Sequence, residues 1–159
     1  MVKNSEGLTV KKKENFSEWY SQIIEKAEIV DLRLGIKGFV TMRPWGAMIM
    51  ENMYRLYEEE LQKKNHLPVI MPSVIPESNL KKESSHIQGF TPEVFWLETG
   101  KGEERLALRP TSETVFTPMF ALWIRSHRDL PMKLYQKGSV FRYDTKATRP
   151  LIRGREFQW

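Results

Sequence analysis

Hydroxyl and carboxylate side chains come together at one predicted strand-to-helix junction. The segment Arg109-Pro-Thr-Ser-Glu-Thr114 follows an apolar run and precedes an apolar helical pattern. One interpretation is structural, because Thr111 or Ser112 would cap the helix and Glu113 would favour its positive end. The other is functional, because a hydroxyl beside a carboxylate makes a pocket for an ammonium group. The residues alone leave both interpretations open.

A second segment combines arginine and aromatic side chains, from Phe141-Arg-Tyr-Asp144 to Trp159. In a hairpin, every second residue points to one face, so Arg142 and Asp144 would share a face. Guanidinium groups aimed into one cleft suit phosphate oxygens, because bidentate charge-assisted bonds hold an oxyanion in place. A solvated basic hairpin, or a nonspecific nucleic-acid surface, fits the same pattern.

The positive charge of the chain is local. Its 159 residues include 25 Lys and Arg against 20 Asp and Glu, a formal charge of +5. Residues 1–80 are balanced at 11 of each, whereas residues 133–159 hold 7 basic and 2 acidic side chains. The excess therefore lies in the segment that contains the arginine–aromatic pattern.

Composition excludes several classes of protein. With 40% hydrophobic and 28% charged residues, the chain is neither a disordered tail nor a membrane span. It has no cysteine, which excludes disulfides, cysteine zinc sites and thiol nucleophiles. Together with the absence of an apolar signal segment at the N-terminus, this favours a cytoplasmic location.

Other common sites are not indicated. The glycine-rich phosphate loops GxxxxGK[ST] and GxGxxG do not occur, so a nucleotide would not be bound by those backbone cradles. His66, His86 and His127 have no partner at metal-ligand spacing, and no metal ligands are identified.

Periodicity predicts an α+β fold with an antiparallel sheet. Helices are expected over residues 15–30, capped by Asn15, and over 44–65, opened by Pro44. A short helix and loop is expected over 76–89, and another helix over 111–126. Strands are expected over 39–42, 67–72, 94–98 paired with 104–109, 134–143 and 151–159. Residues 1–15 are expected to form a flexible leader. The apolar face of the second helix is expected to pack inside: Met50, Met53, Tyr54, Tyr57 and Leu61.

Taken together, these segments resemble prolyl-tRNA synthetase of the archaeal and eukaryotic-cytosolic type. The resemblance rests on Thr111-Ser-Glu-Thr114, on the run from Phe141 to Trp159, and on Arg43-Pro-Trp-Gly46, Leu108-Arg-Pro110 and His127-Arg-Asp-Leu-Pro131. It covers nearly everything after residue 15. Such a colinear set is specific, whereas a single arginine motif would not be.

The resemblance implies a class II synthetase fold, an antiparallel sheet flanked by helices, incomplete here and assembled as a homodimer. Residues 16–159 would be part of the catalytic domain, with motif 1 at about 44–76, motif 2 at about 139–159 and motif 3 absent. The implied reaction joins proline and ATP into prolyl-adenylate and then transfers the prolyl group to the 3′ end of proline tRNA. The chain alone is expected to be inactive.

The resemblance also implies roles for the proline side of the site. Thr111 and Glu113 match the pair that holds the secondary ammonium of proline, with Glu113 as a buried counter-charge. Arg142 matches the motif 2 arginine that contacts both the proline carboxylate and the α-phosphate, and it would stabilise the transition state. Trp159 matches an aromatic wall of the proline pocket.

Further roles concern ATP and tRNA. Arg153 matches an arginine on the ATP phosphates, and Phe157 matches an adenine-stacking position. Asp144 stands where the family usually has glutamate, and it would accept from the adenine amino group. Lys146 and Arg149 would touch the tRNA acceptor stem. The family also implies Mg²⁺ with ATP.

A different class of function stays open. A synthetase-derived module could bind RNA or a protein partner without catalysis. Such a module is expected to have lost Thr111, Glu113 or Arg142, and all three are present. A related synthetase for glycine, threonine or serine is disfavoured by the Thr-Ser-Glu-Thr segment and by the segment from Thr148 to Arg153.

Overall fold

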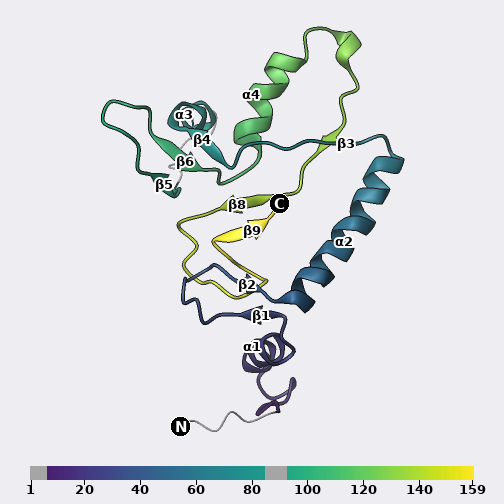
Figure 1. Ribbon diagram of the computed structural model, residues 1–159, viewed down its shortest axis with the longest axis vertical. Helices are drawn as coiled ribbons and strands as arrows, with labels where there is room; N and C mark the ends of the chain where they lie inside the picture. The colour runs from purple at the N-terminus through teal and green to yellow at the C-terminus, as the bar shows by residue number, and fades with distance from the viewer. Residues whose placement is uncertain (1–6, 85–92) are drawn as a thin grey trace.

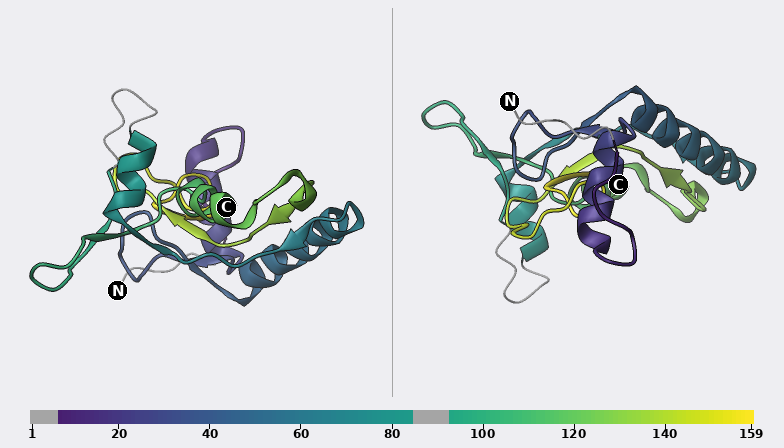
Figure 2. Two further views of the ribbon diagram at one scale, coloured as in Figure 1. Left: turned by 90° about the horizontal axis from the view of Figure 1, so that it is seen from above. Right: turned by 90° about the horizontal axis from the view of Figure 1, so that it is seen from below.

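The computed structural model describes residues 7–84 and 93–159, in which helices alternate with short strands (Figure 1). The helices are α1 (Phe16–Lys26), α2 (Pro44–Lys63), α3 (Glu77–Ser84), α4 (Glu113–Trp123) and the 3-10 turn η1 (His127–Asp129). The strands are β1 (Val30–Asp31), β2 (Thr41–Met42), β3 (Leu67–Pro68), β4 (Val74–Pro76), β5 (Trp96–Leu97), β6 (Leu106–Leu108), β7 (Leu134–Tyr135), β8 (Ser139–Phe141) and β9 (Glu156–Gln158). Helices α1 and α4 lie at opposite ends of the molecule. Helix α2 and the β5–β6 turn extend to opposite sides (Figure 2).

Helix α1 begins where the sequence predicts. The Asn15 side chain caps it by accepting a hydrogen bond from the Glu18 backbone N–H at 3.1 Å. The helix ends at Lys26, four residues earlier than expected, because Glu28 adopts a left-handed conformation with φ of 56°. The chain then turns into β1.

The segment ahead of α1 was expected to be a flexible leader. Residues 1–6 lie outside the described residues. Within the remainder, the Thr9 backbone N–H donates to the Gln22 side chain at 2.9 Å, and the Lys12 ammonium lies 5.0 Å from the centre of the Trp19 ring. Residues 7–15 therefore run along α1 and contact it.

Helix α2 begins at Pro44, as predicted. Proline has no backbone N–H, and the first N–H groups of a helix have no acceptor within the helix, so proline is tolerated there. It ends at Lys63 because Asn65 is left-handed, with φ of 60°. Gly46 is buried where α2 meets the chain before β1. A Cβ there would lie 2.4 Å from the Ile29 carbonyl oxygen, so only glycine permits this approach.

The expected inner face of α2 is wrong for two of its residues. Met53 and Tyr57 are each 66% exposed. They continue a row of exposed apolar side chains at helical spacing along the outer side of α2: Trp45, Met48, Ile49 and Leu56. The partly buried row is the adjacent one, with Met50, Tyr54 and Leu61. The helix lies at the side of the molecule, so only one row faces the body.

The strands form several small sheets rather than one continuous sheet. Strands β4, β6 and β5 make an antiparallel sheet in that order, and β8 pairs antiparallel with β9, as the sequence predicts for both hairpins. Strand β3 pairs with β7 in parallel, which departs from the antiparallel expectation. The long crossover through α3 and α4 permits a parallel pair. Strand β3 is two residues long and tolerates Pro68, because the N–H groups that donate to the β7 segment are those of Leu67 and Val69.

The apolar core lies where the three-stranded sheet meets α3 and α4. Its most buried members are Ile75, Leu80 and Ala107, at 0%, 2% and 0% exposure, with Val94 and Val115 beside them. Fully burying a side chain of this kind contributes roughly 1.5–3 kcal/mol. Among the described residues, no helix is long and apolar enough to cross a membrane.

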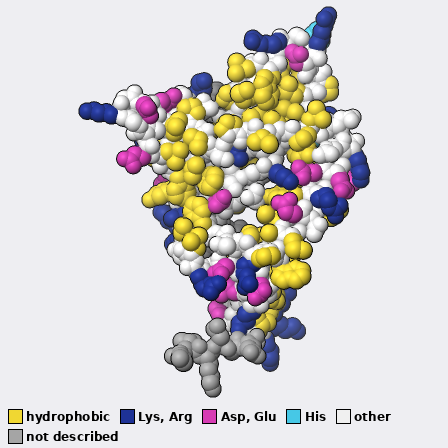
Figure 3. Space-filling view, in the orientation of Figure 1, with side chains coloured by type: hydrophobic (Ala, Val, Ile, Leu, Met, Phe, Trp, Pro, Cys, Tyr) yellow, Lys and Arg dark blue, Asp and Glu magenta, His cyan; other side chains and the backbone are white. Residues whose placement is uncertain are grey.

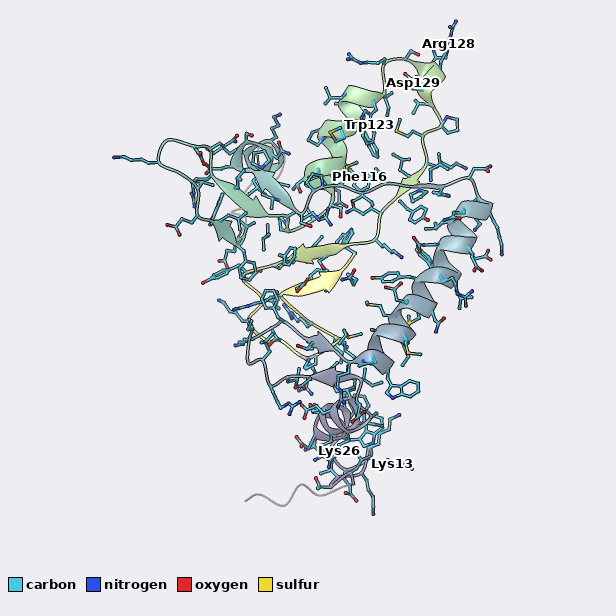
Figure 4. All side chains as sticks on the ribbon, in the orientation of Figure 1. Lys13, Lys26, Phe116, Trp123, Arg128 and Asp129 are labelled. Carbon is cyan, nitrogen blue, oxygen red and sulfur yellow. The ribbon has the colours of Figure 1, made fainter. Side chains whose placement is uncertain are left out.

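Helix α4 is shorter than the predicted range of 111–126 and is only partly covered. Val115 faces the core, but Leu122 and Trp123 are 58% and 37% exposed. The Phe116, Phe120 and Trp123 rings follow one another along the helix, with centroids 5.4 and 6.3 Å apart (Figure 4). Hydrophobic side chains accordingly gather over α4 on the molecular surface (Figure 3).

A buried arginine joins the segments around the core. Arg109 is 2% exposed and directly follows β6. Its Nη1 donates to the carbonyl oxygens of Met71 and Pro72 at 2.9 and 3.0 Å, and its Nε donates to the Ser139 carbonyl at 3.0 Å. Among the described residues, no carboxylate pairs with it. Burial lowers the pKa of its guanidinium.

The backbone of Arg109 makes two further links. Its N–H donates to the Ser73 carbonyl, and its carbonyl accepts from the Phe141 N–H, both at 2.9 Å. One residue therefore connects the segment before β4, the end of β6 and strand β8.

We expect Arg109→Met to lower the free energy of unfolding by about 3 kcal/mol, because buried carbonyl oxygens lose their donors. Arg125→Met is the matched control, since Arg125 is exposed, and it should change stability by no more than about 0.5 kcal/mol. Urea unfolding followed by circular dichroism measures both. Equal stability of the Arg109 variant and the wild type would contradict the role of this arginine.

Candidate active site

The β8–β9 hairpin positions the arginine–aromatic segment. Val140 is opposite Phe157 and Ser139 is opposite Gln158. Val140 is fully buried, so the hairpin is fixed on the body of the molecule. Arg142 follows β8 directly, and its backbone N–H donates to the Arg155 carbonyl at 2.8 Å.

The Arg142 side chain lies against two aromatic rings. Its guanidinium carbon is 5.2 Å from the centre of the Phe157 ring and 5.4 Å from that of the Trp159 ring. Its Nε donates to the Pro110 carbonyl at 3.3 Å. These contacts hold a cation over π faces while other N–H groups of the fork can meet an anion.

Thr111 and Glu113 lie at the start of α4, beside the Pro110 carbonyl that Arg142 contacts. The Thr111 hydroxyl donates to the Glu113 carboxylate, and the Thr114 hydroxyl donates to the Thr111 carbonyl at 2.7 Å. Ser112 is the N-cap residue, but its side chain makes no capping hydrogen bond. The capping interpretation therefore does not account for these hydroxyls.

One expectation about this corner is wrong. Glu113 was expected to be a buried counter-charge, and its side chain is exposed. It stands in the first turn of α4, where its neighbours Ser112, Thr114 and Val115 are buried, but its own side chain lies on the exposed side of the helix. Its carboxylate is accessible to a ligand from solvent.

A cavity of about 690 Å³ lies beside the β8–β9 hairpin, and we name it the main cavity. It brings together four residues that the sequence singles out for ATP, namely Arg142, Asp144, Arg153 and Phe157. The rest of its lining comes from residues 40–42, from α2 and from residues 145–158: Val40, Met42, Met50, Thr145, Leu151, Ile152, Gly154, Glu156 and Gln158. A pocket with apolar walls, two arginines and two carboxylates suits a ligand that has both an aromatic ring and phosphate groups.

The remaining predicted residues lie around this cavity. Trp159 adjoins it through Phe157, with ring centroids 5.9 Å apart. Lys146 is exposed. Arg149 is half-buried, and its Nη1 donates to the Ser17 carbonyl of α1 at 3.2 Å, so part of its guanidinium is held by the protein.

A polar network that the sequence does not indicate connects α2 to the hairpin. The Tyr54 hydroxyl donates to the Gln158 side chain at 3.1 Å, and Gln158 donates to the Ser139 hydroxyl at 3.0 Å. Lys137 donates to Glu58 at 3.0 Å, and this hydrogen bond raises the pKa of Lys137. Burial raises the pKa of Tyr54. Tyr54 and Gln158 are 104 positions apart and Lys137 and Glu58 are 79 apart, so local periodicity carries no signal for these two contacts.

Arg109 was also missed as a residue that supports the site. Its position between an apolar strand and Pro110 was visible, but arginine is seldom fully buried without a carboxylate. The described residues contain no group of three histidine, aspartate or glutamate side chains that could hold a metal ion.

Known proteins resemble this chain in sequence. Residues 95–159 match the family model of the tRNA synthetase class II core domain (G, H, P, S and T). The chain is 57% identical over 159 residues to the proline–tRNA ligase of Thermofilum pendens, covering 98% of this chain and 33% of that protein. It is 52% identical over 147 residues to the proline–tRNA ligase of Pyrococcus abyssi, covering 90% of this chain and 30% of that protein.

Solved structures agree with the sequence comparison. The prolyl-tRNA synthetase of Giardia lamblia in complex with prolyl-adenylate superimposes with a TM-score of 0.88 at 48% identity, covering 96% of this chain and 31% of that one. The Cryptosporidium parvum enzyme complexed with halofuginone and AMPPNP gives 0.85 at 39% identity, covering 97% and 31%. The chain spans about a third of the length of the relatives it matches. By sequence and by structure, it is a homologue of the prolyl-tRNA synthetases and carries part of the class II synthetase core.

Proposed function

We propose that this chain supplies the proline-binding and ATP-binding part of a proline–tRNA ligase. The enzyme would join proline and ATP into prolyl-adenylate with release of pyrophosphate, and then transfer the prolyl group to proline tRNA. The observation that carries the proposal is the main cavity, where Arg142, Asp144, Arg153 and Phe157 come together. The relatives named proline–tRNA ligase support the choice of amino acid.

In this proposal, the proline lies between the start of α4 and Arg142. Its secondary ammonium is held by Thr111 and the accessible carboxylate of Glu113, and Trp159 forms an aromatic wall. The Arg142 fork binds the proline carboxylate and the α-phosphate at once, which aligns the attacking oxygen with phosphorus. Charge that develops on the phosphorus centre is stabilised by the same guanidinium.

The nucleotide occupies the main cavity. Phe157 stacks on adenine, Asp144 accepts from its amino group, and Arg153 binds the phosphates. The carboxylates in the lining are Asp144 and Glu156. A Mg²⁺ ion fits there chiefly through nucleotide phosphates and water, because the lining offers only these two acidic side chains. The ion would neutralise phosphate charge.

The tRNA acceptor stem approaches the motif 2 segment in this proposal. Lys146 is exposed and offers a flexible ammonium to the phosphate backbone. Arg149 contributes the part of its guanidinium that does not bind the Ser17 carbonyl.

The proposal is tested in a hybrid ligase, in which this chain replaces the matching segment of the Thermofilum pendens enzyme. We expect proline-dependent ATP–pyrophosphate exchange, and we expect Arg142→Ala to reduce it at least about 100-fold because transition-state charge loses its donor. Arg125→Ala, at another exposed arginine, should keep wild-type exchange. The parent enzyme and thermal unfolding serve as controls for assembly.

Two outcomes would contradict the proposal. A folded hybrid ligase with no proline-dependent exchange would favour the non-catalytic module. Wild-type exchange in the Arg142 variant would remove the role assigned to that arginine.

We also propose that the enzyme is a homodimer through the outer row of α2. Six apolar side chains along this row, from Trp45 to Tyr57, are each more than half exposed. Exposed apolar rows of this kind mark protein interfaces. In a symmetric dimer, the row from one copy packs on the same row of the other.

Met53→Glu tests this interface. A two-fold interface receives the substitution twice, so we expect the dissociation constant of the hybrid ligase to rise at least about 100-fold. Sedimentation velocity measures the change from dimer to monomer. Lys101→Glu, in the exposed β5–β6 turn, should leave the dimer intact, and a dimeric Met53 variant would exclude this surface.

A further inference from the structure

A second, smaller cavity lies beside the main one. Its lining includes Arg149 and Arg153, but the proposed reaction places no ligand inside it. It has a volume of about 250 Å³ and lies between residues 32–40 and residues 148–154; we name it the tip cavity. Val40, Arg153 and Gly154 line both cavities, so a thin wall separates them.

The charged side chains that line the tip cavity are all positive. Its charged members are Lys37, Arg149 and Arg153, and it contains no acidic residue. The apolar side chains in its lining include Leu32, Ile36 and Phe39. Cations beside apolar side chains suit a nucleotide, because phosphate oxygens meet the cations and the base lies on apolar surface.

The rim of the tip cavity is also unusual. Ile36 in its lining is 53% exposed, and Leu34, next to the lining in sequence, is 69% exposed. On the other segment, Leu151 and Ile152 line the main cavity and are 50% and 63% exposed. Aliphatic side chains exposed on two facing loops indicate a surface that meets a partner. The cations beside them select an anionic partner.

Both walls of the tip cavity are held in place by the protein. The Gly38 carbonyl accepts from the Arg155 and Glu156 N–H groups at 2.7 and 3.3 Å, and Gly38 has φ of 85°, which favours glycine. On the other wall, the Tyr20 hydroxyl donates to the Pro150 carbonyl at 2.9 Å. A preformed cavity loses less conformational entropy when it binds.

We propose that the tip cavity holds one nucleotide of the tRNA acceptor strand, with Lys37 bound to its phosphate. This inference rests on the proposed ligase function. In that reaction the 3′ end of the tRNA must reach the main cavity, so the nucleotides before it must cross the neighbouring surface. The tip cavity shares three lining residues with the main cavity, and its charge matches a phosphodiester. A free nucleotide has the same chemistry, and the test separates the two sources.

The test compares two activities of the hybrid ligase, since exchange needs no tRNA and charging does. We expect Lys37→Ala to raise the KM for proline tRNA about 5-fold in charging, while proline-dependent exchange and the KM for ATP stay at wild-type values. The plot of log(kcat/KM) for charging against log salt has a negative slope. Loss of one phosphate contact should make this slope less steep by about 0.7–0.9. Lys37→Arg should retain most of the tRNA affinity. Lys101→Ala, an exposed lysine of the β5–β6 turn, is the matched control.

Each result decides the inference. A wild-type KM for tRNA with an unchanged salt slope in Lys37→Ala overturns it. A raised KM for ATP in exchange also overturns it, because the cavity then serves the free nucleotide. A folded wild-type hybrid without proline-dependent exchange refutes the ligase function itself, and the inference falls with it.

Discussion

The arrangement of the site depends on the burial of a single guanidinium. Arg109 is 2% exposed and donates to the carbonyls of Met71, Pro72 and Ser139. A buried cation is costly unless its N–H groups are satisfied, so these segments must stay together for the fold to form. The backbone of the same residue binds Ser73 and Phe141. Together these contacts set the distance between the start of α4 and the β8–β9 hairpin.

The two halves of the proposed amino-acid site inherit their geometry from this connection. Thr111 and Glu113 follow Arg109 within four residues, and Arg142 follows the strand whose Phe141 N–H binds the Arg109 carbonyl. Arg142 itself closes the corner by donating to the Pro110 carbonyl. On the far side of the hairpin, Tyr54 reaches Gln158, so β9 is anchored to α2 as well. The proposed dimer helix and the proposed catalytic residue Arg142 therefore belong to one connected set of contacts.

Local patterns predicted most elements and the family, because caps, prolines and alternation act over a few residues. Asn15, Pro44 and both antiparallel hairpins are examples. The predicted ends of α1 and α2 were too far along the chain. Glu28 and Asn65 adopt a left-handed backbone conformation, which apolar periodicity does not indicate. The prediction of the inner face of α2 was partly wrong because the helix has two adjacent apolar rows. The sequence does not indicate which of the two rows contacts the rest of the protein. The parallel β3–β7 pair and the contacts of Arg109 join residues far apart in the chain, so they required the tertiary structure.

The net charge of the C-terminal segment overstates how many of its cations can bind a ligand. Lys137 already pairs with Glu58, and Arg155 donates to the Thr145 carbonyl and lies 5.5 Å from the centre of the Tyr143 ring. A cation that exchanges a protein partner for a phosphate gains only the difference between the two interactions. The cavity arginines are placed differently, since Arg142 and Arg153 line the main cavity. Within the main cavity, an oxyanion therefore meets those two guanidinium groups, whereas Lys137 and Arg155 chiefly hold the hairpin and its loop in place.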